Sequence, residues 1–278
     1  MSVEAAVIHY KKDFVPAFEQ RSSFLKAMAT KESVMNGNTA TFLVSGSGGD
    51  TAVTRGTNGL IPYGNPTNSQ PAATLVEKHA PYKLTGFNVF ASQGDQVRVM
   101  RDASIAAINR DIDLTMLAEL ANATQDFGSG TASLSTVLGA QAILGNNDVP
   151  VEDENNMFGI ISPAFRGYLM QTTEFANGDY VDVKQFAGPA RRMWRWNGVN
   201  WVVSSRITGL GTSAEICYMF HRSAIGYAVA LGEDKIFAGY NEEQAYSWSR
   251  AEVYHGAKIL QNTGIVKITH DGSAFVAT

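Results

Sequence analysis

The sequence predicts an α+β fold, and three observations support this class. Residues 96–124 have the apolar spacing of one long helix. Short segments with the alternation typical of strands lie on both sides of it. A glycine-rich segment, SGSGGDTAVTRGTNGLIPYGNPTNSQP over residues 45–71, has neither pattern. Compact domains rarely contain a structureless connection beyond about 15 residues unless it has a role, so this segment is either disordered or held by another surface.

The N-terminal part predicts an arm followed by a hairpin. Residues 7–34 mix apolar and basic side chains and are interrupted by Pro16, which predicts an arm of short helical and extended pieces. Residues 39–46, TATFLVSG, predict a strand. Residues 73–92 predict a second extended pair of segments, broken at Pro81 and Gly86. The glycine-rich segment and its flanks therefore predict one very long hairpin.

Residues 96–124 predict a helix of roughly 42 Å. Its alanines favour helix over strand, and Asp95 suits the N-cap position. The predicted core face consists of apolar residues at spacings of three and four: Ile105, Ile108, Ile112, Met116 and Leu120. The charged residues, which we expect to face solvent or a neighbouring chain, are Arg98, Arg101, Arg110, Asp111 and Asp113.

The glycine-rich stretch FGSGTAS, residues 127–133, predicts a break in the chain and a domain boundary. A helix over 134–144 and an acidic loop follow. An apolar strand then stops at Ser162-Pro163, where the next helix begins, because proline is tolerated at the first helical position.

The last third of the sequence predicts mostly strands. MWRWNGVNWVV, residues 193–203, predicts a hairpin that turns on Asn197-Gly198 and pairs Trp194 with Trp201. The remaining predicted elements are a strand over 214–220, a helix over HRSAIGYAVALG, and two strands over 247–268 that join near Gly256.

Composition narrows the classes of function. With 278 residues, 45% of them hydrophobic and 17% charged, the chain predicts a globular protein with a substantial core. A net charge of -4 and the lack of a basic stripe argue against a protein that coats itself with nucleic acid. Cys217 is the only cysteine, so no intramolecular disulfide forms, and no window has the length of a membrane span. We therefore expect a cytosolic product.

Candidate chemical motifs are weak throughout the sequence. The glycine-rich segment lacks the GxxxxGK[ST] phosphate loop. Cys217 and His221 have no residue placed to orient the histidine, and residues 152–154 lack the alternate spacing of a calcium loop. The five histidines have no zinc-ligand spacing. We expect no catalytic, cofactor-binding or metal-binding residues and no cofactor.

The order of these elements resembles the major capsid protein of tailed bacteriophages, which has the Hong Kong ninety-seven type fold. Four stretches carry the resemblance and together cover residues 146–269: NNDVPVEDENNMFGIISPAFRGYLMQ, WNGVNWVVSSRI, MFHRSAIGYAVA and YHGAKILQNTGIVKIT. The resemblance implies an N-terminal arm over residues 1–35, a peripheral domain over 36–130 and 243–278, and an axial domain over 131–242.

Within the implied peripheral domain, residues 96–124 resemble the spine helix and residues 45–72 resemble the extended loop that lies across a neighbouring subunit. The loop residues expected to make this contact are Arg55, Leu60, Ile61 and Tyr63. In the phage for which the fold is named, a lysine on this loop forms isopeptide links between subunits. No lysine occurs between Ser45 and Ala73, so we expect a shell without covalent links.

The resemblance implies a structural function and no enzymatic one. Pentamers and hexamers of the chain would assemble in the host bacterial cytoplasm into the icosahedral head of a virion. The expected partners are further copies of the chain, separate scaffolding, portal and cement proteins, and double-stranded DNA contacted without sequence specificity; no membrane is expected. A fused scaffold is not expected, because it would need on the order of a hundred additional residues.

Two other functions stay open from the sequence. An encapsulin-like cellular compartment would use the same fold and would purify together with an enzyme cargo. A glycan-binding tail adhesin would stack sugars on Trp194, Trp196 and Trp201 of the predicted hairpin. Aromatic residues on a hairpin more often pack in a core, which disfavours the adhesin.

Overall fold

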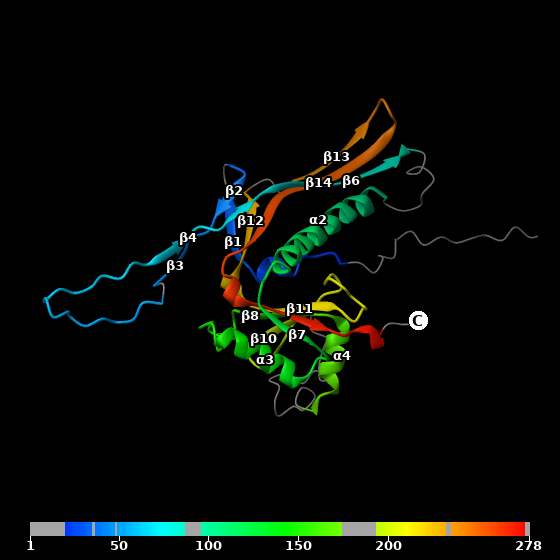
Figure 1. Ribbon diagram of the computed structural model, residues 1–278. Helices are drawn as coiled ribbons and strands as arrows, with labels where there is room; N and C mark the ends of the chain where they lie inside the picture. The colour runs from blue at the N-terminus through cyan, green and yellow to red at the C-terminus, as the bar shows by residue number, and fades with distance from the viewer. Residues whose placement is uncertain are drawn as a thin grey trace, which may run out of the picture.

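The computed structural model describes residues 20–34, 37–47, 49–86, 96–173, 193–231 and 235–275. These residues form two lobes and a long loop that projects from one of them (Figure 1). One lobe is built on a five-stranded sheet with a long helix on one face, and the other is built on a six-stranded sheet with two shorter helices. The predicted α+β class is confirmed. Asp95, the predicted N-cap, lies outside the described residues.

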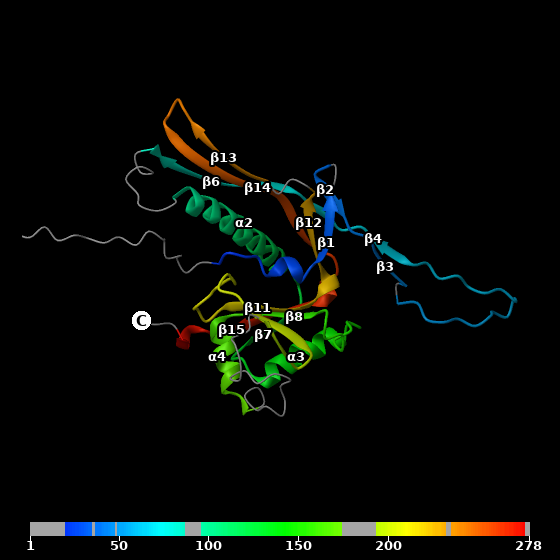
Figure 2. The same cartoon turned by 180° about the vertical axis from the view of Figure 1, so that it is seen from behind.

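The five-stranded sheet has the order β1-β12-β14-β13, and β6 pairs with β14 as well. β1 runs parallel to β12, and the other pairs are antiparallel. Helix α2, Gln96–Leu120, lies along one face of β6 and β14 (Figures 1 and 2). The strands are β1 Thr30–Val34, β6 Val76–Thr85, β12 Ile225–Ala230, β13 Lys235–Asn241 and β14 Tyr246–Ile259.

The predicted helix over HRSAIGYAVALG is wrong. The structure has a short 3-10 helix there, η2 Arg222–Ala224, followed by strand β12. β12 lies between β1 and β14, so pairing with two distant strands decides its conformation. Strand β13 was not predicted, and neither was the strand β1 that the end of the arm contributes.

Two predicted breaks in this sheet are also wrong. β6 continues through Pro81, because β6 is paired on one side only and such a strand tolerates a residue without an N–H. β14 continues through Gly256, and the chain turns at η3, Asn262–Gly264, instead. A Cβ atom on Gly256 would lie 2.3 Å from the carbonyl oxygen of Thr74, so this glycine permits close contact between two backbones.

The six-stranded sheet has the order β7-β15-β11-β8-β10-β9. Its strands are β7 Asp126–Gly130, β8 Met157–Ile161, β9 Met193–Trp196, β10 Val199–Val203, β11 Glu215–His221 and β15 Ile265–His270. Helices α3, Leu134–Gly145, and α4, Pro163–Gln171, accompany it, with a last 3-10 turn η4 at Ser273–Phe275. Ser133 and Ser162 cap the two helices by accepting bonds from the N–H groups of Thr136 and Phe165.

Local turn chemistry in this lobe agrees with the sequence, with one exception. Asn197 and Gly198 both have positive φ angles, as a type I′ hairpin turn requires, and Trp194 pairs with Trp201 as predicted. The predicted break at residues 127–133 is wrong over most of its length, because residues 126–130 form β7. β7 pairs parallel to β15, more than a hundred residues away, which local sequence does not reveal.

Sheet membership departs from the predicted domain limits. The expected boundary at residues 242 and 243 assigns β12 and β13 to the axial domain and β15 to the peripheral domain. The structure places β12 and β13 with β14 in the five-stranded sheet, and it places β15 beside β11 in the six-stranded sheet. Within the described residues, the chain therefore passes between the lobes at three connections: residues 121–125, η2 and residues 260–264.

These three connections lie side by side and are bonded to one another. The N–H of Thr124 donates to the side-chain oxygen of Asn262 at 3.0 Å, and the N–H of Leu260 donates to the carbonyl of Ala224 at 2.8 Å. One hydrophobic core is continuous through both lobes, with members such as Met116 and Trp201. No helix in the described part of the chain combines the length and the apolar character that crossing a membrane demands.

Candidate assembly surface

The segment between β2 and β5 projects from the five-stranded lobe as a long loop (Figures 1 and 2). Two short antiparallel pairs form its stem: β2 Thr39–Thr41 with β5 Ala72–Thr74, and β3 Val44–Gly46 with β4 Thr67–Ser69. At the base, Ala40, Phe42, Ala73 and Ala228 form a small separate core. The predicted long hairpin is confirmed, and its base is fixed to β12.

The outer part of the loop is shaped by short local bonds. The N–H of Gly56 donates to the carbonyl of Leu60 at 2.8 Å, and the N–H of Gly59 donates to the carbonyl of Gly56 at 2.9 Å. Arg55 donates from Nη1 to the carbonyl of Gly59 at 2.7 Å. Gly59 has φ +76°, a conformation that favours glycine. The tip is therefore a defined turn, although it lies away from the core.

Apolar side chains on this loop are exposed in the single chain. Leu60 is 67%, Ile61 48% and Tyr63 96% exposed, and Val53 and Leu43 are exposed as well. Single exposed apolar residues are ordinary, whereas a group of them on one projecting loop is typical of surfaces that bind another molecule. The predicted contact residues Leu60, Ile61 and Tyr63 belong to this group, and Arg55 lies beside it.

The predicted core face of α2 is buried only toward its C-terminal end. Ile112, Met116 and Leu120 are buried, and Ile108 is partly buried against the same core. Ile105 is 36% exposed, so its assignment to the core face is wrong for the single chain. The physical reason is that the main core reaches α2 only from Ile108 onward.

Two aspartates of α2 were predicted to face solvent or a neighbouring chain, and both have partners within the chain. Asp111 accepts a bond from Nε2 of His255 on β14 at 3.0 Å, and Nζ of Lys78 on β6 lies 3.5 Å from it. Burial lowers the pKa of His255, and the bond to Asp111 opposes this shift. Asp113 is 2% exposed and contacts residues 20–25.

Sequence reasoning missed Asp113, although a signal was present. Asp113 precedes Met116 by three residues and Leu117 by four, which places it on the buried side of the helix. A charged residue on a helix is usually solvated, and that expectation outweighed the spacing.

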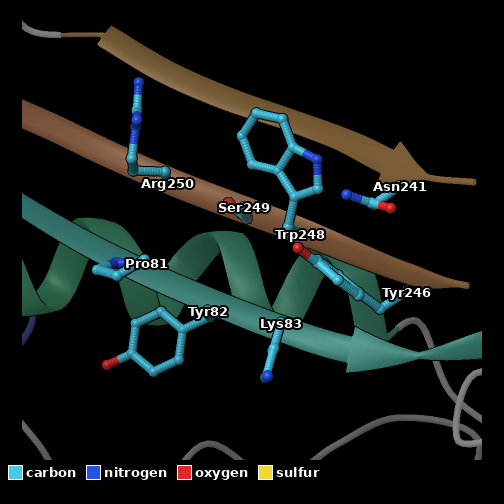
Figure 3. A pocket seen from close by; sticks show the side chains of 8 residues that line it. All are labelled: Pro81, Tyr82, Lys83, Asn241, Tyr246, Trp248, Ser249 and Arg250. Atoms are coloured by element: carbon cyan, nitrogen blue, oxygen red, sulfur yellow. The ribbon is translucent and has the colours of Figure 1, made fainter. Parts of the chain in front are cut away.

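The other face of the five-stranded sheet carries an open groove of about 590 Å³ (Figure 3). Tyr246, Trp248 and Arg250 alternate along β14 and project from one face, with α2 behind the sheet. Nζ of Lys83 lies 5.8 Å from the ring centroid of Tyr246. The guanidinium of Arg250 lies 5.5 Å from the ring of Phe237. The lining is thus aromatic and cationic; it consists of Pro81, Tyr82, Lys83, Asn241, Tyr246, Trp248, Ser249 and Arg250.

The residues that the sequence offered as weak candidates for catalysis or metal binding have structural roles in the fold. Burial raises the pKa of the Cys217 thiol to about 12, so this cysteine is not a nucleophile at neutral pH. In the acidic loop, Glu154 pairs with Arg195 at 2.8 Å, and Asp153 accepts bonds from its neighbours Asn155 and Asn156. Among the described residues, no group of three or more histidine, cysteine, aspartate or glutamate side chains is placed to hold a metal ion.

The tryptophans of the hairpin are core residues. Trp194, Trp196 and Trp201 are all buried, and Trp201 donates from Nε1 to the carbonyl of Trp196 at 3.0 Å. Phe165 of α4 stacks on Trp201 with ring centroids 6.4 Å apart. These rings present no face to a sugar, which removes the observation on which the adhesin alternative depended.

Comparison with known proteins gives one family and one fold. The model of a family described as phage capsid protein matches residues 3–272 of this chain. A structure from Mycobacterium phage Che8 is similar at 15% identity, with a TM-score of 0.75 over 96% of this chain and 98% of that chain. The capsid of Ralstonia phage GP4 is similar at 10% identity, with a TM-score of 0.73 over 100% of both chains. No curated protein matches the sequence. At these identities the structural likeness shows the fold.

Proposed function

This chain belongs to the phage capsid protein family and is a structural major capsid protein, and we propose that its pentamers and hexamers close into an icosahedral head around double-stranded DNA. The resemblance to the Hong Kong ninety-seven type of capsid protein is confirmed. Proteins of this family and fold have a structural role, and they act as shells built from many copies. We propose that the protein catalyses no reaction.

The observation that carries this proposal is the projecting loop. Its apolar residues Leu60, Ile61 and Tyr63 are exposed in one chain, and its stem is fixed to the body of the subunit. Such a loop buries its side chains when it lies on a different surface of the next copy. A contact between unlike surfaces repeats from subunit to subunit and closes when the rotation completes a ring. We propose that Arg55, Leu60, Ile61 and Tyr63 make this contact.

The two lobes correspond to the domains of the capsid fold in our proposal. The five-stranded sheet with α2 is the peripheral domain, and α2 is the spine helix. The six-stranded sheet with α3 and α4 is the axial domain, which gathers around the five-fold and six-fold axes. These limits follow the sheets, so β12 and β13 belong to the peripheral domain and β15 to the axial domain.

Further partners are part of the same proposal. We propose that separate scaffolding, portal and cement proteins take part in assembly, which occurs in the cytoplasm of the host bacterium before the protein becomes part of the virion. A net charge of -4 suits a wall that contacts packaged DNA without binding it tightly, since tight phosphate binding requires clustered lysine and arginine.

Removal of the loop tests the proposal. A variant with residues 46–69 replaced by a short Gly-Ser turn keeps the β2 and β5 pair, so we expect a folded subunit that forms no closed shells. Circular dichroism reports folding, and sedimentation with negative-stain electron microscopy reports shells. Shells of normal size from this variant would overturn the assignment of the loop.

A second variant keeps the length of the loop. Replacing Leu60, Ile61 and Tyr63 together by serine removes the exposed apolar group, and we expect fewer or no closed shells. Leu210→Ser, at an exposed leucine in the other lobe, is the matched control and should assemble normally. Equal assembly of the triple variant and the control would contradict the proposed contact.

A further inference from the structure

Asp113 lies within α2 and is 2% exposed, which is unusual for an ionised side chain. A buried carboxylate needs partners, because removing a charge from water without compensating bonds is costly. The partners that the structure gives Asp113 are neutral N–H and O–H groups, and all of them belong to residues 20–25, about ninety positions earlier in the sequence. We define residues 20–29 as the N-terminal segment.

Several donors of this segment converge on the one carboxylate. Oδ1 accepts from the hydroxyl of Ser23 at 2.5 Å and from the backbone N–H groups of Phe24 and Leu25, each at 3.2 Å. Oδ2 accepts from the N–H of Phe24 at 3.2 Å and from the side-chain amide of Gln20. Bonds to an ionised acceptor are the stronger kind. Two consecutive backbone N–H groups can both donate to one carboxylate in only one register of the segment on the helix. An apolar contact alone would let the segment slide along the helix.

Neighbouring residues of α2 hold the same segment. Asn109 donates from Nδ2 to the carbonyl of Arg21 at 2.9 Å, and Arg110 donates from Nη1 to the carbonyl of Gln20 at 3.4 Å. Asp111, two residues before Asp113, instead faces β14 and β6. One turn of α2 is therefore bonded to the sheet on one side and to the N-terminal segment on another.

The N-terminal segment leads from this anchor into the core and then into the sheet. Leu25, Met28 and Ala29 are buried in the main core, and the chain continues into β1 beside β12. The segment therefore joins the middle of α2 to the edge of the five-stranded sheet. Asp113 is its polar fixed point, at the place where the chain arrives from residues 1–19.

We propose that Asp113 is a positioning residue for shell assembly: it fixes the register of the N-terminal segment on α2 and thereby the path of that segment from the middle of α2 to β1. The anchor itself follows from the contacts, while its role in assembly rests on the proposed function. A force that a neighbouring subunit exerts on this segment then acts on the middle of α2.

Asp113→Asn tests the anchor with little change in shape. Asparagine has one acceptor oxygen and adds an N–H₂ group that faces other donors, so the segment should loosen. Hydrogen exchange followed by mass spectrometry should show amides of residues 20–29 exchanging on the order of tenfold faster, because bonds to a charged acceptor are lost. Exchange in β8 and β11, within the other lobe, should be unchanged. Unchanged exchange in residues 20–29 would overturn the anchor.

Asp111→Asn is the matched control, because it makes the same substitution two residues away on a side that faces the sheet. It should leave the exchange of residues 20–29 as in the wild type, and equal loosening by both variants would show a general effect of lost charge and overturn the specific role. If Asp113→Asn fails to fold, the double variant Gln20→Ala with Ser23→Ala removes two donors and keeps Asp113. Faster exchange confined to residues 20–29 supports the anchor in that variant, and wild-type exchange there contradicts it.

Electron microscopy of the same variants separates the two parts of the inference. We expect Asp113→Asn subunits to be folded and to give fewer closed shells than Asp111→Asn subunits at equal concentration. Normal shells from Asp113→Asn with a loosened segment would refute the positioning role and leave the anchor in place. Normal shells from the loop-deletion variant would instead refute the proposed loop contact, so the two failures are distinguishable.

Discussion

Ile105 and Ile112 give a matched test of which side of α2 stabilises the subunit. Both are isoleucines on one helix, but Ile105 is 36% exposed and Ile112 is 2% exposed within the main core. Truncation of a buried isoleucine to alanine costs about 2–5 kcal/mol, because transfer free energy is lost and a cavity remains. Truncation of the exposed one removes less buried area and should cost roughly 1 kcal/mol or less.

The difference is large enough to measure by thermal unfolding. For a chain of this length, 1 kcal/mol corresponds to a shift in Tm of about 2–4 °C, so Ile112→Ala should lower Tm by about 4–20 °C and Ile105→Ala by less than about 4 °C. Unassembled subunits must be compared at equal concentration, because assembly adds its own stabilisation. Ile112→Lys should prevent folding, since a lone buried ammonium costs several kcal/mol. Equal shifts for the two alanine variants would refute the assignment of the buried side.

Three further outcomes are expected. Burial lowers the pKa of His255 below the ordinary 6.5, so the unfolded chain binds more protons and stability should fall as the pH drops below about 6.5; His255→Gln should reduce that loss in urea unfolding, and an unchanged slope would contradict it. Shells run on a denaturing gel without reductant should give one band near 30.0 kDa, because the Cys217 thiol is buried and the loop has no lysine; a ladder of oligomers would argue against this. Gly159→Val should destabilise the six-stranded lobe, because even a Cβ there would lie 2.5 Å from the Trp201 ring; wild-type Tm would disprove this packing argument.

Elements set by local chemistry were predictable from the sequence. Ser162-Pro163 starts α4 because the serine caps the helix and the proline tolerates its first position. Asn197-Gly198 sets the hairpin and the pairing of Trp194 with Trp201, because a two-residue turn fixes the register. In these cases the residues that decide the structure are neighbours in the sequence.

Elements set by distant partners were not predictable. Residues 225–230 have small and apolar side chains that also suit a helix, and pairing with β1 and β14 makes them a strand. β7 forms in a glycine-rich stretch because β15 provides its ladder, and Asp113 is buried because residues 20–25 provide its donors. The sequence predicts the loop as a segment without a core of its own, but the exposure of its apolar side chains can be seen only in the structure.

The three bonded connections between the lobes have a mechanical consequence. A single connection would act as a hinge about which the lobes could swing. Here a rotation of one lobe against the other strains all three connections together. It also breaks the bonds at Asn262 and Ala224 and shears a continuous core. Load on a wall made of such units, such as outward pressure from a packed interior, is shared among three parallel connections. The subunit therefore resists torsion as one unit, so a change in the shape of an assembly falls on the contacts between subunits rather than within one.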